Sequence, residues 1–214
     1  MWAITWLTLR VSATGTLLSL LLGVPLGTFL GLSSFPGRRL ALSLVNVGMG
    51  LPPVVAGLWV SLFLWRSGPL GRLELMYTPA AMAIAQAVIA APIVTGLCAA
   101  AVQAVNPRLR LQILSLGASP TQMLWLLLRE ARLGLLAAVM AGFGAAVSEV
   151  GASMMVGGNV LGQTRVLTTA TLMEVSRGHF DVAIALSVIL MALAFGITAA
   201  LTAVQQRGER RGPA

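Results

Sequence analysis

The sequence predicts an all-α integral membrane protein with about five transmembrane helices, folded as a single domain over residues 1–214. The first observation is composition, because 57% of the residues are hydrophobic and 9% are charged, whereas a soluble domain carries about 25% charged residues. The second is a set of apolar runs of the about 20 residues that a helix needs to cross a bilayer. They cover approximately residues 11–32, 40–65, 79–105, 133–156 and 182–204.

The basic residues predict how these helices are oriented. All fourteen are arginine, and they lie between the apolar runs rather than in a stripe on a polar domain, which argues against nucleic-acid binding. Five spans place nine arginines on one side, and the positive-inside rule makes that side the cytoplasm. We therefore expect a multi-pass protein of a bacterial or archaeal inner membrane, with its N-terminus outside and its C-terminus in the cytoplasm. The nine are Arg38, Arg39, Arg108, Arg110, Arg129, Arg132, Arg207, Arg210 and Arg211.

Residue types that are rare or missing exclude several chemistries. The chain has no lysine, so it lacks the P-loop of an ATPase, and ATP hydrolysis would have to come from another chain. Cys98 and His179 are the only residues of their types, so neither an internal disulfide nor a cysteine or histidine metal cluster is expected. We expect no catalytic residue, no metal and no cofactor.

Small residues recur at four-residue spacing in the first and fourth runs. Such faces let helix backbones approach closely in lipid. Ordinary packing inside the bundle is the simpler interpretation, and a moving interface or a dimer interface is the alternative. The two sets are Gly23, Gly27 and Gly31, and Gly144, Ser148 and Ala152.

The connection between the third and fourth runs, about residues 106–125, predicts two helices separated by a sharp turn. Asn106 is a good N-cap with Pro107 at the first helical position, and Ser119 repeats this arrangement with the proline that follows it. Gly117 is placed to end the first helix in a left-handed conformation. That helix is too short to span and too apolar to float free. It therefore lies on the membrane surface or docks into a groove on a partner, and we favour docking.

Three stretches resemble the permeases of binding-protein-dependent ABC importers. Leu116-Gly117-Ala118-Ser119, which follows a surface helix and precedes a span, resembles the cytoplasmic coupling loop of that family. Residues 51–58, Leu-Pro-Pro-Val-Val-Ala-Gly-Leu, resemble the second-span motif of molybdate, sulfate and tungstate permeases. Residues 148–159 and 162–170 are similar to the tungstate permeases in particular. The loop departs from the family pattern at residues 111–113, where Leu-Gln-Ile stands in place of Glu-Ala-Ala.

The resemblance implies a type I ABC importer permease fold and the import of a tetrahedral oxyanion, tungstate before molybdate or sulfate. It also implies a homodimer of this chain, cytoplasmic ABC ATPase subunits and a periplasmic or lipid-anchored substrate-binding protein. In that family the coupling loop inserts into the ATPase subunit. The residues that the resemblance assigns to ATPase coupling are Leu116, Gly117, Ala118 and Ser119.

The segment 157–181 would face outward and carries donors that suit a tetrahedral oxyanion. We expect the translocation path or the binding-protein contact to involve Thr164, Arg165, Thr168 and Thr169, with Arg165 and Thr169 on one face if this segment is helical. The simpler interpretation is an interfacial helix whose threonines bond to its own backbone.

Glu149 lies near the outer end of the fourth run, where an unpaired carboxylate in lipid costs several kcal/mol. Its negative charge would also repel an oxyanion. We expect a structural role with Arg165 as a partner, and a role in gating or along the translocation path is the alternative.

Two other functional classes compete with an importer permease. A gradient-driven transporter or channel would favour paired ionisable residues inside the spans, and Glu149 is the one candidate there. An intramembrane enzyme would need paired aspartates or a histidine pair, and Asp181 is the only aspartate. Neither class gives a purpose to the helix pair on the cytoplasmic side.

Overall fold

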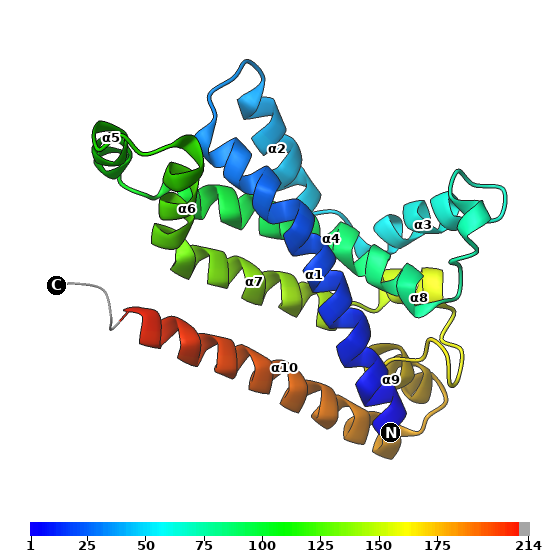
Figure 1. Cartoon of the computed structure of the whole chain (residues 1–214). Coiled ribbons are helices and arrows are strands. Elements are labelled where there is room, and N and C mark those ends of the chain that lie inside the picture. Colours follow the sequence, from blue (N-terminus) through cyan, green and yellow to red (C-terminus); the bar gives the residue numbers. More distant parts are fainter. Residues whose placement is uncertain (210–214) are drawn as a thin grey trace.

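The computed structural model describes residues 1–209 as a bundle of helices (Figure 1). The predicted all-α class is confirmed, while Arg210 and Arg211 of the predicted tail lie outside the described residues. In chain order, the elements are α1 Trp2–Leu32, α2 Arg38–Met49, α3 Pro53–Leu64, the 3₁₀ turn η1 Gly71–Leu73, α4 Pro79–Gln103, α5 Pro107–Ser115, α6 Pro120–Glu130, α7 Arg132–Val147, α8 Gly151–Gly157, α9 Leu167–Ser176 and α10 Phe180–Glu209.

Helices α1, α4 and α10 are each long and apolar enough to cross a membrane. The bent pairs α2–α3 and α7–α8 bring the number of candidate spans to as many as five. α1 begins well before the run predicted from residue 11, and the hydroxyls of its first turns bond to the backbone of the helix itself. The hydroxyl of Thr8, for example, donates to the carbonyl of Ile4 at 2.8 Å.

Two of the predicted spans are broken rather than continuous. α2 and α3 meet at a bend of 103° near Gly50 and Pro52, and α7 and α8 meet at 57° around Glu149. The first break coincides with two consecutive prolines, which lack the N–H that would continue a helix. The second break has no proline, and Glu149 lies within it. After the breaks, α3 and α8 pack on each other so closely that a Cβ at Gly57 would meet the Cβ of Ala152 at 3.0 Å.

The centre of the bundle is the contact between α1 and α4, which small residues bring close together. A Cβ at Gly15 would meet the Cβ of Gln86 at 2.9 Å, and one at Gly23 would meet Val94 Cγ1 at 2.8 Å. Gly27 leaves still less room, because it faces the backbone carbonyl of Thr95. The predicted packing role of the first glycine set is therefore confirmed.

The spans alternate in direction, so the connections gather at two ends of the bundle (Figure 1). Helices α5 and α6 project at one end, where α10 also finishes. The start of α1, helix α9 and the start of α10 lie at the other end. The two predicted sites, the loop around Gly117 and the segment around Arg165, therefore lie at opposite ends of the bundle.

Candidate functional site

The turn between α5 and α6 has the local geometry that the sequence predicts. The side chain of Asn106 accepts from the backbone N–H of Arg108 at 2.9 Å, which caps α5. Ser119 forms a capping box with Gln122, because the Ser119 hydroxyl accepts from the Gln122 amide while the Gln122 side chain accepts from the Ser119 amide. Between these caps, Gly117 has a φ of +77°. A side chain there would be strained by this left-handed backbone, although nothing crowds the site.

This turn exposes leucines instead of burying them. Leu116 is 85% exposed and Leu111 is 67% exposed, although both are large apolar side chains. Ile113 and Leu127 are buried, and α6 packs against both α5 and α7. Arg110 adds a long hydrogen bond of 3.4 Å from its Nη1 to the carbonyl of Leu32, at the end of α1. The pair therefore has an anchored side and an apolar tip that nothing in the described chain covers.

At the opposite end, Glu149 holds the break between α7 and α8. It is 5% exposed, and its Oε1 accepts from the backbone N–H of Ala152 at 2.7 Å, in the first turn of α8. Its own carbonyl accepts from the hydroxyl of Thr168 at 3.0 Å. Glu149 therefore satisfies backbone groups that the broken helix leaves free. Glu149 and Arg165 form no ion pair in the part of the chain that the structure describes, so the structure does not bring them together as expected.

The three candidate threonines are all buried, and their hydroxyls are engaged by the backbone. Thr164 donates to the carbonyl of Gly157 and accepts from the amide of Val160, while Thr169 caps α9 at Val166. α9 begins only at Leu167, so Arg165 precedes the helix and shares no helical face with Thr169. Thr164 and Thr169 thus bond to the backbone of their own segment, whereas Thr168 donates to the carbonyl of Glu149.

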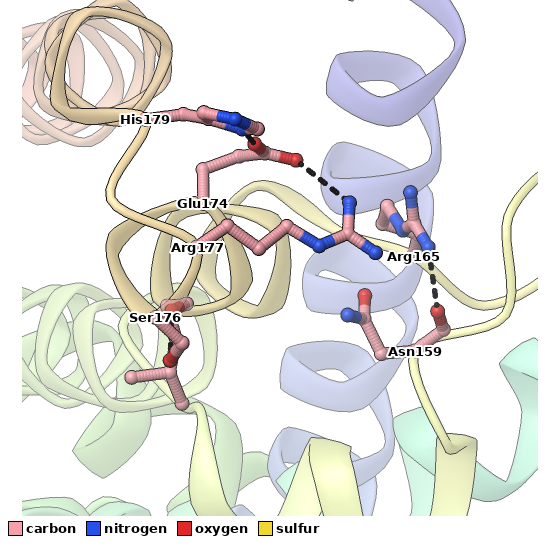
Figure 2. A network of polar contacts seen from close by, with 7 residues as sticks. Asn159, Arg165, Glu174, Ser176, Arg177 and His179 are labelled. Atoms are coloured by element: carbon pink, nitrogen blue, oxygen red, sulfur yellow. Dashed lines mark hydrogen bonds and ion pairs between the residues drawn. The ribbon is translucent and has the colours of Figure 1, made fainter.

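Arg165 is the candidate that keeps an unused donor. Its Nη2 donates weakly to the carbonyl of Asn159 at 3.3 Å, while its buried Nε has no partner among the described residues. In Figure 2 its guanidinium and that of Arg177 point toward one another, next to the carboxylate of Glu174. Glu174 in turn contacts Arg177 Nη1 at 3.5 Å and His179 Nδ1 at 2.8 Å. Two guanidinium groups therefore lie around the single carboxylate of Glu174 here.

Two features of this end have no signal in the sequence. The hydroxyl of Thr8, in α1, accepts from the backbone N–H of Leu167 at 2.9 Å and so caps α9 from across the bundle. Glu174 is the centre of the polar network in Figure 2 although it is one of several acidic residues in the chain. Among residues 1–209, no group of three or more His, Cys, Asp or Glu side chains is placed to hold a metal.

Comparison with known proteins identifies the architecture. The family described as binding-protein-dependent transport system inner membrane component matches residues 23–209. The chain belongs to this permease family. It is similar to a probable anion ABC transporter permease protein of Haloferax volcanii. The two are 41% identical, and the match covers 92% of this chain and 87% of that one. It is also 38% identical to the tungstate uptake system permease protein of Peptoclostridium acidaminophilum, covering 96% of this chain and 90% of that one.

The fold of this permease matches that of a solved importer. A structure of the methionine ABC transporter MetNI, described as inward facing, aligns with a TM-score of 0.81 at 21% identity and covers 97% of both chains. The predicted type I importer permease fold is thereby confirmed. A permease of this family is a multi-pass inner-membrane transport component and not an enzyme, and its family implies ATPase and substrate-binding protein partners.

Replacing Glu149 separates its role as an acceptor from its charge. Glu149→Gln keeps a side-chain oxygen for the Ala152 amide, so the purified permease should melt at the unchanged temperature. Glu149→Ala leaves that buried amide without its partner and should cost about 1 kcal/mol, or a few degrees of melting temperature. The measurement is thermal unfolding in detergent, with Glu130→Ala, at an exposed position of α6, as the control. A Gln variant as unstable as the Ala variant would mean that the negative charge itself is needed.

Proposed function

We propose that this permease subunit forms the membrane path of an ATP-driven importer for a tetrahedral oxyanion, with tungstate as the substrate. The anion permease and tungstate permease relatives support the substrate class. Molybdate and sulfate share the shape and charge of tungstate and are the alternatives within this class. The observation that carries the ATP-driven mechanism is the projecting α5–α6 turn with its uncovered leucine tip.

A gradient-driven transporter is less well supported. Such a protein uses ionisable residues inside its spans, which exchange protons or ions with the path. Glu149 is buried at a helix break and accepts from the backbone of Ala152 there. The network of Glu174 lies between α9 and α10, at the end of the bundle, where Arg177 is well exposed. Neither group resembles a relay through the membrane.

The proposed oxyanion path lies between two copies of the chain. Inside one copy, α4 is packed too tightly for an ion, since Cβ atoms at Gly23 of α1 and Gly142 of α7 would meet Val94 at 2.8 and 2.7 Å. On the outside, Cβ atoms at Gly144 and Gly196 would meet nothing within 4 Å. The open faces of α7 at Gly144 and of α10 at Gly196 therefore suit the homodimer interface, whereas Ala152 of the second small-residue set is buried against Gly57 of α3.

The proposed contact with the ATPase is the tip formed by Leu116, Gly117, Ala118 and Ser119. An 85% exposed leucine on a rigidly capped turn has the form of a knob for a partner's groove. Arg110 connects this helix pair to the end of α1, and α6 continues through Ala131 into α7. Motion of an ATPase at the tip would be transmitted to those two spans. This arrangement requires the tip to be cytoplasmic, with the N-terminus outside.

Of the residues proposed for the outer end, Arg165 is the one suited to meet the oxyanion or the binding protein. Its side chain is half-buried and its Nη atoms make a single weak hydrogen bond at 3.3 Å, whereas Thr164, Thr168 and Thr169 are occupied with backbone groups and serve to build the segment. A single guanidinium binds a dianion weakly in contact with water, which suits an entry site because the permease has to release its substrate.

The substrate proposal is tested with the intact importer in proteoliposomes, with its own ATPase and binding protein. Uptake of tungstate should saturate at a lower concentration than uptake of molybdate or sulfate, and a tenfold excess of either competitor should reduce it only partly. The measurement is initial uptake rate, with ATP omitted as the control. Sulfate uptake equal to tungstate uptake would contradict the assignment of tungstate.

Leu116→Asp tests the contact with the ATPase. A charge at the tip would have to be desolvated in the partner's groove, so recovery of the ATPase with the purified permease should fall about tenfold or more. The matched control is Leu161→Asp, because Leu161 is 69% exposed but lies in the 158–166 segment at the opposite end. Equal recovery of the ATPase with both variants would remove the tip from the proposal.

Arg165→Ala tests the outer site. The variant loses the free donor, so tungstate uptake should slow several-fold while the affinity of the isolated binding protein for tungstate is unchanged. Arg72→Ala, at an exposed arginine of η1 on the same end, is the control and should transport normally. Unchanged uptake by Arg165→Ala would show that this guanidinium has no part in transport.

A further inference from the structure

An apolar groove lies between α1, α2 and α4 and belongs to neither of the sites above. It has a volume of about 840 Å³, and every side chain lining it is apolar except Thr95. Leu22 and Leu26 of α1, Leu44 of α2 and Val88 of α4 line it and are exposed. Its lining on α4 covers residues 84–95, about 16 Å of helix, which is close to half of the about 30 Å hydrocarbon core of a bilayer. The groove therefore has the length of one leaflet.

A basic pocket lies at the start of α2, the helix that forms one wall of this groove. The pocket has a volume of about 340 Å³ and is lined by Ser34, Phe35, Gly37, Arg38 and Arg39. It includes the N-terminus of a 12-residue helix with no acidic residue in its first turn. Backbone dipole and side chains thus both favour an anion here.

The two arginines of this pocket retain free donors. Arg38 donates through Nε to the carbonyl of Leu30 at 2.7 Å, and its Nη groups have no partner among the described residues. Arg39 is exposed and makes no hydrogen bond or ion pair within residues 1–209. Arg38 precedes Val45, a groove residue, by seven positions, so both lie on one face of α2. The distance along the helix from Arg38 to Leu44 is about 9 Å.

We propose that the pocket and the groove together form a binding site for one anionic phospholipid. The phosphate lies against Arg38, Arg39 and the start of α2, and an acyl chain lies in the groove below. The 9 Å offset exceeds the headgroup layer of roughly 5–8 Å on each side of a bilayer, so Leu44 lies at the depth of acyl chains. Basic pockets at the cytoplasmic ends of membrane helices select anionic headgroups. A second copy of the chain would complement the apolar groove but would leave the free arginine donors unexplained.

The proposed lipid site lies where α1, α2 and α5 are joined by hydrogen bonds from arginine side chains. Arg38 holds the last carbonyls of α1 through Leu30, and Arg110 of α5 holds Leu32 two residues later. A phosphate on Arg38 and Arg39 therefore lies beside the point where the α5–α6 pair is attached to the bundle. The lipid would fix α2 against α1 at the end on which the ATPase is proposed to act.

The experiment is native mass spectrometry of the purified full-length permease, exchanged into equal amounts of phosphatidylglycerol and phosphatidylcholine with matched acyl chains. The unsubstituted permease should retain phosphatidylglycerol at least fivefold over phosphatidylcholine. Arg39→Gln should reduce that preference about fivefold, because it removes one charge at the headgroup and no contact within the protein. Arg66→Gln, which removes an arginine at the other end of the bundle, is the matched control and should keep the preference.

Val88→Trp tests the groove independently of the charge. The larger side chain at this exposed position of α4 would fill the space for the acyl chain, so retention of both lipids should fall while Arg39 is intact. Equal retention of the two lipids by the unsubstituted permease, or an unchanged preference in Arg39→Gln, would overturn the proposal. Full retention by Val88→Trp would overturn the assignment of the acyl chain to the groove.

Discussion

A chain that crosses a bilayer has to satisfy its own backbone, because hydrocarbon offers no hydrogen bonds. Three of the spans meet this constraint as single helices, and the other two interrupt the helix near Gly50 and Glu149. At the first break, two prolines follow Leu51 and remove two amides that would need partners. At the second, the carboxylate of Glu149 accepts from the next helix, and Thr168 donates to the carbonyl of Glu149. The side chains at these positions therefore reduce the number of backbone groups that would lack a hydrogen-bond partner in lipid.

The two breaks determine which helices of the bundle pack against each other. They change the direction of α3 and α8, so that the two short helices pack on each other through Gly57 and Ala152 and on the start of α4, where Gly157 faces Met82. The long helices α1 and α4 remain as a close-packed body held by glycines. Because that body has no room for an ion, the proposed path lies at its outer faces, and the two ends of the bundle are left for partners. One end presents the exposed apolar side chain of Leu116, and the other end presents the guanidinium groups of Arg165 and Arg177.

Local features of the chain were predictable from the sequence, and contacts across it were not. The caps at Asn106 and Ser119 and the left-handed Gly117 follow from residues within a few positions of each other, so a short stretch contains all the information. The break at Glu149 was missed, because hydropathy over 133–156 averages across it and no proline marks it. The expected pairing of Glu149 with Arg165 was also absent, because the carboxylate accepts from the amide of Ala152. The Glu149 carbonyl accepts from the hydroxyl of Thr168, nineteen positions away. Hydrogen-bond partners far apart in the sequence depend on where α9 lies relative to α8. The hydrophobic periodicity of the sequence does not specify that position.

The central claim is that the two ends of the bundle face opposite sides of the membrane, with the α5–α6 tip toward the ATPase in the cytoplasm. It is tested most directly with single cysteines, since Cys98, the only native one, is buried. Leu116→Cys and Leu161→Cys are treated with a membrane-impermeant maleimide in right-side-out and in inverted vesicles. Leu116→Cys should react only in inverted vesicles, and Leu161→Cys should react only in right-side-out vesicles. Labelling of Leu116→Cys in right-side-out vesicles would contradict it.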